Sequence, residues 1–334
     1  MKKRIVLSFI FLISIFFITG CESNNKNDIA KKAKLLDWKN VYKEISSNGA
    51  KATDYNDKWF IFTGTVTNIK EDSCEIFTER TLDGNPVNGI TVYMKTDELK
   101  KLKDDQSLSV VGKANFTDDS NELKQAFVFP KELYNDKHFQ IELVSTQDRD
   151  YTPHYFSDYE FDSKGNKTKY TEISYGITIK GHKQIKQQDT DKYTLKYNDK
   201  NQLISEQKKS FVNKGAGDIT AGSKETTYTY NEDGFVSTVT VPSIYKGEDF
   251  TVYQYTYEKD SNGKIIKGTK NSAHSGTVTY EYDKNGNIIK ETGQTTTYTY
   301  KYDGKRLVSR KGVYNSSGSE NENTKYYYGV VGIK

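Results

Sequence analysis

The phrase that decides the fold reads Tyr280-Glu281-Tyr282-Asp283-Lys284-Asn285-Gly286-Asn287-Ile288-Ile289-Lys290. Before Asp283 the side chains alternate in character, which is the pattern of a strand with two different faces. Asp and Asn followed by Gly supply the positive φ angles of a tight turn. Apolar side chains resume directly after this turn. The stretch therefore predicts a β-hairpin.

Related phrases recur through the second half of the chain, where 22 of the 26 Tyr residues lie at or after position 151. Because a single hairpin is only marginally stable in water, neighbouring copies must share a face. The sequence thus predicts a mainly β chain, with antiparallel β-hairpin repeats that form an extended or rolled sheet over residues 155–334. Six turns are recognisable, at residues 161–165, 197–201, 230–234, 257–263, 282–286 and 302–304.

The phrase at 280–290 resembles the YD repeats of Rhs and wall-associated bacterial proteins. The resemblance covers about residues 155–310 and is clear in two or three copies. Rhs proteins build large shells from many repeats, and about six copies are too few to close such a shell. The resemblance therefore implies a short open or rolled sheet, and it does not imply encapsulation.

The Tyr residues of the repeats form rows on single strands. Because side chains alternate between the two faces of a strand, each row lies on one face. One interpretation is a cross-strand aromatic ladder that holds the sheet together. The other is an exposed platform for a carbohydrate or a protein partner. The candidate ligand-binding residues are Tyr253, Tyr255, Tyr257, Tyr280, Tyr282, Tyr298, Tyr300 and Tyr302.

Residues 1–20 have the pattern of a secretory signal. A basic start precedes an apolar stretch, residues 5–18, that is too short to span a bilayer as a helix. The sequence Ile18-Thr19-Gly20-Cys21 resembles the lipobox of bacterial lipoproteins. The resemblance implies cleavage before Cys21, a diacylglycerol thioether on its sulfur, and anchoring at the extracellular face of the cell membrane. Frequent Lys, Asn and Ile suggest a Gram-positive source.

A polar tether is predicted at residues 21–34, followed by a helix that begins near Leu35 and ends before Gly49. Five strand-like runs come next, with a short helix between the third and the fourth. This is the order of an OB-fold barrel. Gly64 lies inside the first run, where a bulge or a sharp bend is expected. The runs are residues 58–69, 74–78, 89–94, 107–114 and 123–129.

Residues 52–59, 63–66 and 108–113 resemble the tRNA anticodon-binding-like OB domains of bacterial secreted proteins and lipoproteins. The resemblance covers residues 35–134 and leaves 135–154 as a linker. It implies a relation of fold, without RNA binding. Residues 50–134 hold 11 basic and 15 acidic side chains, whereas a phosphate-binding groove needs a basic face, so no nucleic-acid partner is expected. The aromatic residues Trp59, Phe60, Phe62, Tyr93 and Phe127 are interpreted as barrel core.

Nothing in the sequence indicates catalysis, a cofactor or a metal site. No nucleophile motif, P-loop or dinucleotide fingerprint occurs. Asp283-x-Asn285-Gly286-Asn287 partly imitates a calcium loop, but Gln294 stands where the bidentate Glu is required. Cys74, the one Cys besides Cys21, is predicted to be a core thiol. The four His residues lack ligand spacing; they are His138, His154, His182 and His274.

Two functions remain open from these patterns. The first is a membrane-anchored, non-enzymatic cell-surface lipoprotein that binds an envelope polymer, a carbohydrate or a protein through its β domains. The second is a structural or accessory envelope scaffold without a small ligand. The exposure of the Tyr rows distinguishes the two: solvent-facing rows beside a groove indicate binding, and full burial indicates a scaffold.

Overall fold

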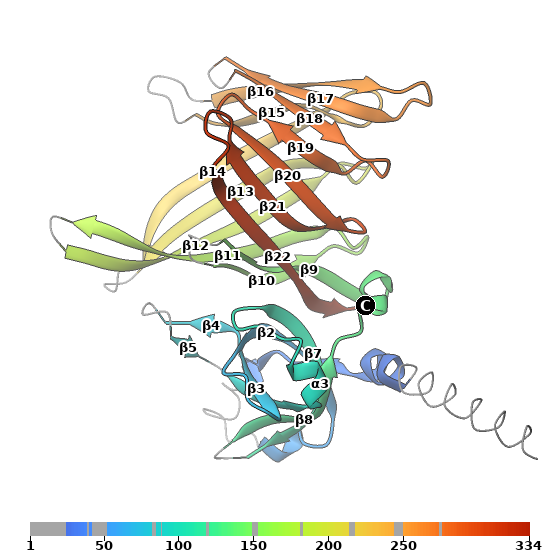
Figure 1. Cartoon of the computed structure of the whole chain (residues 1–334), viewed down its shortest axis with the longest axis vertical. Coiled ribbons are helices and arrows are strands. Elements are labelled where there is room, and N and C mark those ends of the chain that lie inside the picture. The colour runs from blue at the N-terminus through green and yellow to red at the C-terminus, as the bar shows by residue number, and fades with distance from the viewer. Residues whose placement is uncertain are drawn as a thin grey trace, which may run out of the picture. The chain divides into compact units, whose positions relative to one another are not determined.

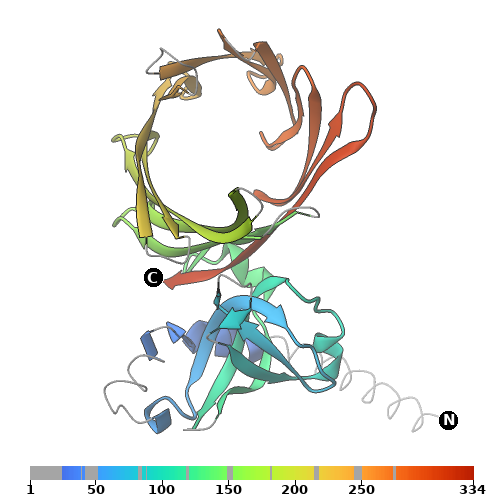
Figure 2. The same ribbon diagram turned by 90° about the vertical axis from the view of Figure 1, so that its left-hand side faces the viewer.

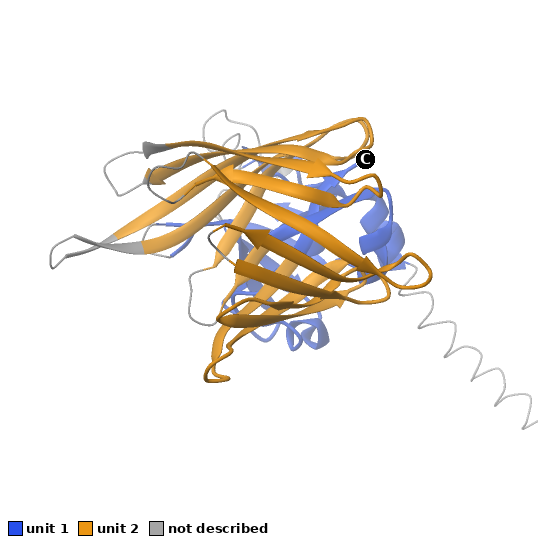
Figure 3. Cartoon of the chain, turned by 90° about the horizontal axis from the view of Figure 1, so that it is seen from above, with its two compact units in different colours: residues 1–144, 328–334 blue, residues 145–327 orange. Residues whose placement is uncertain are grey.

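The computed structural model forms two compact units (Figures 1 and 3). Unit 1 comprises residues 1–144 and 328–334, and unit 2 comprises residues 145–327. Strands dominate both units, which confirms the mainly β prediction. No helix in the described part of the chain is long and apolar enough to cross a membrane. The structure describes residues 25–38, 40–41, 52–81, 85–87, 89–117, 120–148, 153–180, 183–213, 218–243, 250–273 and 276–334.

Unit 1 is built around a closed five-stranded barrel. Its strands are β2 (Trp59–Thr67), β3 (Ser73–Phe77), β6 (Ile90–Met94), β7 (Ser107–Phe116) and β8 (Asn121–Val128). They are joined in the order β2-β3-β6-β8-β7, and β7 pairs with β2 to close the barrel. All pairings are antiparallel except that of β6 with β8. Helix α3 (Thr96–Leu99) follows the third barrel strand, which confirms the predicted strand count and helix position.

The barrel core consists of the inward apolar side chains of these strands. Val66, Ile76 and Val92 are completely buried, and Phe62 is 1% exposed. Cys74 lies in the same cluster, where burial raises the pKa of its thiol to about 12. The predicted role of Cys74 as a core thiol is therefore confirmed. Smaller elements flank the barrel: β1 (Lys34–Leu35), β4 (Glu79–Arg80), β5 (Pro86–Val87), η1 (Ala52–Asp54) and η2 (Lys131–Asn135).

Gly64 marks a close approach of two strands. β2 pairs with β7 from Trp59 to Thr65 without a register shift, so the expected bulge is absent from this pairing. A Cβ atom at position 64 would lie 2.5 Å from the carbonyl oxygen of Phe77 on β3. The glycine is required because the backbone of β3 passes directly over it.

The N-terminal helix lies earlier than the sequence predicts. Residues 25–32, expected in the tether, are helical, and Ala30 and Ala33 at this end are buried. Lys34–Leu35, expected to begin a helix, form β1, which pairs in parallel with β2. Trp38 and residues 40–41 are helical, and the rest of the predicted helix lies outside the described residues. Helical spacing around Leu35 was misleading because pairing with a distant strand decides its conformation.

The hairpin repeats form a closed antiparallel barrel of fourteen strands, which Figure 2 shows as a ring. Each strand pairs with the next one along the chain, and β9 lies between β22 and β10. The strands are β9 (Phe139–Gln147), β10 (His154–Phe161), β11 (Lys167–Lys180), β12 (Lys183–Tyr197), β13 (Leu203–Asn213), β14 (Asp218–Tyr230), β15 (Val236–Pro242), β16 (Phe250–Lys259), β17 (Ile265–Ser272), β18 (Gly276–Tyr282), β19 (Ile288–Thr292), β20 (Thr296–Asp303), β21 (Arg306–Tyr314) and β22 (Glu320–Ile333).

This closure goes further than the predicted extended or rolled sheet. The open alternative was wrong, because no edge is left between β9 and its two neighbours. β9 comes from residues expected to be a linker. The number of hairpins recognisable in the sequence therefore underestimated the number of strands available for closure.

The turn chemistry of the repeats is confirmed. Gly165, Gly234, Gly263, Gly286 and Gly304 all have positive φ angles, between 63° and 85°, and Asn201 takes the equivalent place with a φ of 59°. In the fifth turn, Oδ1 of Asp283 accepts the backbone N–H groups of Asn285 and Asn287 at 2.7 and 2.9 Å. The same pair of bonds occurs at Asp162, Asn198 and Asp260, and Asn231 Oδ1 accepts one of them, from the backbone N–H of Phe235.

Candidate functional site

The pairing register places the three predicted Tyr rows on one face of the large barrel. Tyr257 stands opposite Gly268, which stands opposite Tyr280. Tyr280 stands opposite Glu291, which stands opposite Tyr298. Side chains directly opposite each other in antiparallel strands project to the same side. All eight candidate Tyr residues, on β16, β18 and β20, therefore share a single surface.

This surface is the concave, inner face of the barrel. Residues between the Tyr positions, such as Gln254 and Thr256, are exposed, as expected for the outer face. On the Tyr face, electrostatic interactions extend from Tyr255 on β16 to Glu291 on β19, and from Tyr170 on β11 to Tyr228 on β14. Three strand spacings amount to roughly 14 Å along a sheet. Side chains that far apart interact only where the sheet curves toward them.

Seven of the eight Tyr side chains are partly exposed, and one is buried. Tyr280 is 8% exposed, and the other seven are half-buried. Burial, followed by neighbouring Tyr residues, raises the pKa of Tyr255 and of Tyr282 to about 12, and Glu291 adds to the shift at Tyr255. These hydroxyls are therefore neutral at physiological pH and remain hydrogen-bond donors. The rows combine features of both predicted alternatives, a structural ladder and a contact surface.

Another set of inner-face bonds ties successive hairpins together. In each case a Tyr residue that precedes a turn donates a hydrogen bond from its O–H group to a backbone oxygen of the preceding hairpin. The accepting residue is the first one in the second strand of that hairpin. These bonds join Tyr197 to Lys167 at 2.9 Å, Tyr230 to Leu203 at 2.7 Å, and Tyr257 to Val236 at 2.8 Å. These hydrogen bonds explain why Tyr recurs before the turns of the repeat. For these Tyr residues they favour the interpretation as a ladder that holds the sheet together.

A pocket of 470 Å³ lies at the turn ends of three successive hairpins. Tyr257 and Tyr282, both predicted as candidates, contribute to its wall. The rings of Phe235 and Tyr257 lie 5.5 Å apart between centroids. The pocket thus combines four aromatic side chains, Tyr230, Phe235, Tyr257 and Tyr282, with the polar side chains of Lys264, Lys284 and Asn285.

Of the four aromatic side chains in the pocket, sequence reasoning missed two as candidate site residues. Tyr230 was counted as part of a turn motif, and Phe235 follows the same turn directly. The signal that could have found them is their place in the repeat, because equivalent positions of neighbouring hairpins come together when the strands pair in register. The other predicted Tyr residues, such as Tyr253 and Tyr298, do not line this pocket.

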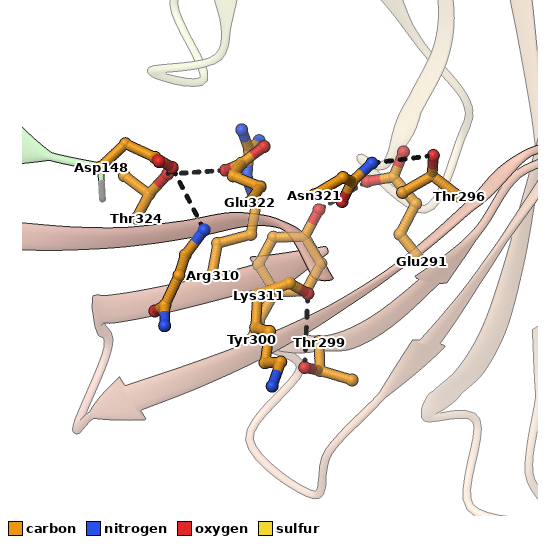
Figure 4. Close-up of polar contacts among 11 residues, drawn as sticks. Asp148, Glu291, Thr296, Thr299, Tyr300, Arg310, Lys311, Asn321, Glu322 and Thr324 are labelled. Atoms are coloured by element: carbon orange, nitrogen blue, oxygen red, sulfur yellow. Dashed lines mark hydrogen bonds and ion pairs between the residues drawn. The ribbon is translucent and has the colours of Figure 1, made fainter. Parts of the chain in front are cut away.

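Charged side chains also lie on the inner face, along β19–β22 (Figure 4). The hydroxyl of Tyr300 donates to Glu291 Oε2 at 2.5 Å, and Arg310 Nε donates to Glu322 Oε1 at 2.6 Å. Burial and then the Glu291 carboxylate raise the pKa of Tyr300, while Glu322 keeps Arg310 protonated. These groups are already paired with one another, so they stabilise the inner face and leave little free reactive chemistry.

Of the described His residues, His154 is paired with a carboxylate. His154 Nδ1 lies 2.7 Å from Glu172 Oε1, and Tyr193 donates to Glu172 Oε2 at 3.0 Å. His154 is the first residue of β10. Within the described ranges, no group of three or more His, Cys, Asp or Glu side chains could hold a metal ion. His182, His274 and the lipobox residues Ile18, Thr19, Gly20 and Cys21 lie outside those ranges.

The aromatic residues of the small barrel divide into two groups. Phe60 and Phe62 are buried in the barrel core, as predicted, whereas Phe127 is buried in a second apolar cluster with Ile61 and Val111. Trp59 and Tyr93 are only half-buried, and together with Phe127 they line a pocket of 530 Å³. Their interpretation as barrel core was therefore wrong. Trp59 packs against the second apolar cluster, and Tyr93 alternates along β6 with the core residues Val92 and Met94, so both side chains lie on the outer side of the small barrel.

No protein-family model matches the chain, and no curated protein matches it either. A porin-like protein from Bacteroides uniformis ATCC 8492 is 16% identical with a TM-score of 0.28, covering 57% of this chain and 96% of that one. A porin-like protein from Bacteroides vulgatus ATCC 8482 is 7% identical with a TM-score of 0.25, covering 55% and 97%. The structure of TcdB2-TccC3 is 10% identical with a TM-score of 0.22, covering 76% and 14%. TM-scores this low support no functional assignment.

Proposed function

We propose that this chain is a non-enzymatic, lipid-anchored cell-surface protein that binds a saccharide of the cell envelope through the inner face of its large barrel. The observation that carries the proposal is the pocket with four aromatic side chains beside the half-buried Tyr rows. Aromatic rings pack against the apolar faces of sugar rings, and a few polar groups fix the orientation of a ligand. Lys264, Lys284 and Asn285 provide donors for sugar hydroxyls.

Anchoring rests on the resemblance of Ile18-Thr19-Gly20-Cys21 to a lipobox. A thioether-linked diacylglycerol on Cys21 holds the protein at the extracellular face of the membrane of a Gram-positive cell. This location brings the barrel into contact with envelope polymers. It also agrees with the expectation that no nucleic acid is bound, which rests on the acidic balance of residues 50–134.

Both domain resemblances are part of the proposal. Unit 1 is assigned to the OB-fold group on the strand order β2-β3-β6-β8-β7, the closure by β7 and β2, and the helix after the third barrel strand. We assign the hairpins to the YD repeats for two reasons. Tyr hydroxyls donate hydrogen bonds to the backbone of the preceding hairpin, and Asp or Asn side chains accept backbone hydrogen bonds within the turns.

Saccharide binding is tested with residues 22–334 on a glycan array, followed by titration of the strongest ligand. We expect Tyr282→Leu to weaken binding about tenfold, because the few residues that dominate binding are enriched in Tyr and each costs more than about 1 kcal/mol when truncated. Tyr253→Leu is the matched control, since Tyr253 lies on the same inner face outside the pocket. Equal losses in the two variants, or an array without any ligand, would contradict the proposal.

Lipid anchoring has its own test in the native cell. Cys21→Ala should abolish incorporation of radiolabelled lipid and release the protein from the membrane fraction, because the thioether needs the Cys21 sulfur. Cys74→Ala should keep full labelling, since Cys74 is buried in the small barrel. Continued labelling of Cys21→Ala would refute the lipobox assignment.

The alternative is an envelope scaffold without a small ligand. The hydroxyl bonds of Tyr197, Tyr230 and Tyr257 to the backbone favour it, because they use Tyr side chains to join hairpins. A scaffold predicts an empty glycan array together with normal anchoring. The two experiments above therefore separate it from the binding protein.

A further inference from the structure

The outer face of the large barrel carries a second feature, a trough of 710 Å³ over β11–β14. Strand alternation places Lys192 and Lys209 on the side opposite Tyr193 and Lys208. The register lines up one residue from each of four neighbouring strands, Thr171, Lys192, Lys209 and Ser223. All four line the trough. This row consists of two ammonium groups and two hydroxyl groups, all of which can donate hydrogen bonds, and it contains no carboxylate.

Lys192 and Lys209 stand directly opposite each other, which is an unfavourable placement for two like charges. Among the described residues, neither lysine forms an ion pair. Other outer-face lysines face a cross-strand acid: Lys267 lies 3.3 Å from Glu258, and Lys290 lies 2.8 Å from Glu281. Lys192 and Lys209 thus differ from these other lysines of the outer face, because each of them stands opposite a lysine and not opposite an acid.

An aromatic ring holds both ammonium groups in place. Lys192 Nζ lies 5.4 Å from the centroid of the Phe211 ring, and Lys209 Nζ lies 5.3 Å from the same centroid. Phe211 shares the outer face with Lys209, two residues away on β13. Cation–π attraction offsets part of the repulsion between the lysines without neutralising their charge. The pair therefore stays available to an external anion.

The acids of the trough lie at its β10 side. Glu160 pairs with Lys169 at 3.0 Å, which leaves Asp158 as the other carboxylate in the lining. The cationic centre is accordingly the Lys192–Lys209 pair, with Thr194 and Gln207 in the next row as further neutral polar groups. Lysine binds phosphate as a point charge, whereas arginine binds both phosphate and carboxylate through its planar fork.

We propose that this trough binds phosphate groups of an anionic polymer, at a site separate from the saccharide pocket of the inner face. One phosphate lies between Lys192 and Lys209 and accepts further hydrogen bonds from Thr171 and Ser223. Because the two lysines neutralise about two negative charges of the polymer, binding depends on salt: a fourfold rise in salt concentration weakens it about tenfold. The site needs neither the lipid anchor nor a sugar ligand.

Titration of residues 22–334 with sodium polyphosphate tests the proposal. We expect Lys192→Gln/Lys209→Gln to weaken binding about tenfold and to reduce its salt dependence. The control Lys267→Gln/Lys290→Gln removes the same net charge from ion-paired lysines of the outer face and should leave binding within about twofold. Polyglutamate of equal charge should bind more weakly. Absence of polyphosphate binding, equal losses in both double variants, or equally tight polyglutamate binding would overturn the proposal.

Discussion

The fourteen-stranded barrel should unfold cooperatively as the pH rises from 10 toward 12, while it stays folded at neutral pH. The reason is the burial of Tyr side chains on its inner face. Burial, and then neighbouring charges or Tyr residues, raises the pKa of Tyr228, Tyr255 and Tyr282 from 10.0 to about 12. The pKa values of Tyr170, Tyr193, Tyr280 and Tyr300 are raised as well.

The sign of the effect follows from proton binding in the two states. Below pH 10 these hydroxyls are protonated in both the folded and the unfolded chain, so their stabilisation is fully present. Between pH 10 and about 12 the unfolded chain releases protons that the folded chain keeps, and the free energy of unfolding falls. Each such Tyr contributes at most about 1.4 kcal/mol per pH unit, and less where water screens a partly exposed ring.

Circular dichroism and tyrosinate absorbance, followed against pH, measure this transition. The double variant Tyr255→Phe/Tyr282→Phe removes two hydroxyls with raised pKa values. The pKa shifts of these two groups arise from burial and from neighbouring residues, with no hydrogen bond among their causes. We expect it to move the alkaline transition to higher pH with little change in stability at pH 7. If all Tyr residues titrated near pH 10 while the circular dichroism signal of the β-sheet stayed unchanged, the prediction of alkaline unfolding would be contradicted.

Gly64→Ala should destabilise the five-stranded barrel by about 3 kcal/mol. The new methyl group would lie 2.5 Å from the carbonyl oxygen of Phe77 and 2.8 Å from Ile76 Cγ2. The carbonyl belongs to the backbone of β3, so no change of rotamer relieves the contact. β2 and β3 must separate, and the buried side chains between them lose packing.

Tryptophan fluorescence during urea unfolding isolates this effect. The two Trp residues of the chain, Trp38 and Trp59, both belong to unit 1, whereas most Tyr residues belong to the large barrel. Gly89→Ala is the matched control, because the nearest atom to a Cβ there, the carbonyl oxygen of Ile76, is 3.8 Å away. Similar urea midpoints for the two variants would show that the close approach of β3 to Gly64 does not determine the stability of the five-stranded barrel.

The local structure of the repeats could be predicted because it depends on neighbouring residues. Positive φ angles at Gly286 and Asn201, and the bonds of Asp283 to its own turn, follow from side-chain chemistry over a few positions. The strands of the small barrel were predictable for the same reason. Local spacing failed at Leu35, where pairing of β1 with β2 overrides an apparent helical pattern.

The candidate site could be predicted only in part. Strand alternation placed Tyr257 and Tyr282 on defined faces of their strands, and both line the inner pocket. Phe235 was missed because its approach to Tyr257 depends on pairing between hairpins. The trough escaped notice for a similar reason: Lys192 and Lys209 are 17 positions apart and meet only through the register of β12 and β13.

The sequence by itself determined the hairpins, their turns and the alternation of Tyr with polar residues, because each depends on contacts within a few positions of the chain. The tertiary structure decided that the hairpins close into a barrel and that the Tyr rows line its inner face. Closure requires β22 to pair with β9, which lies far away in sequence. Such pairing is governed by strand number, tilt and curvature of the whole sheet, which no single repeat encodes.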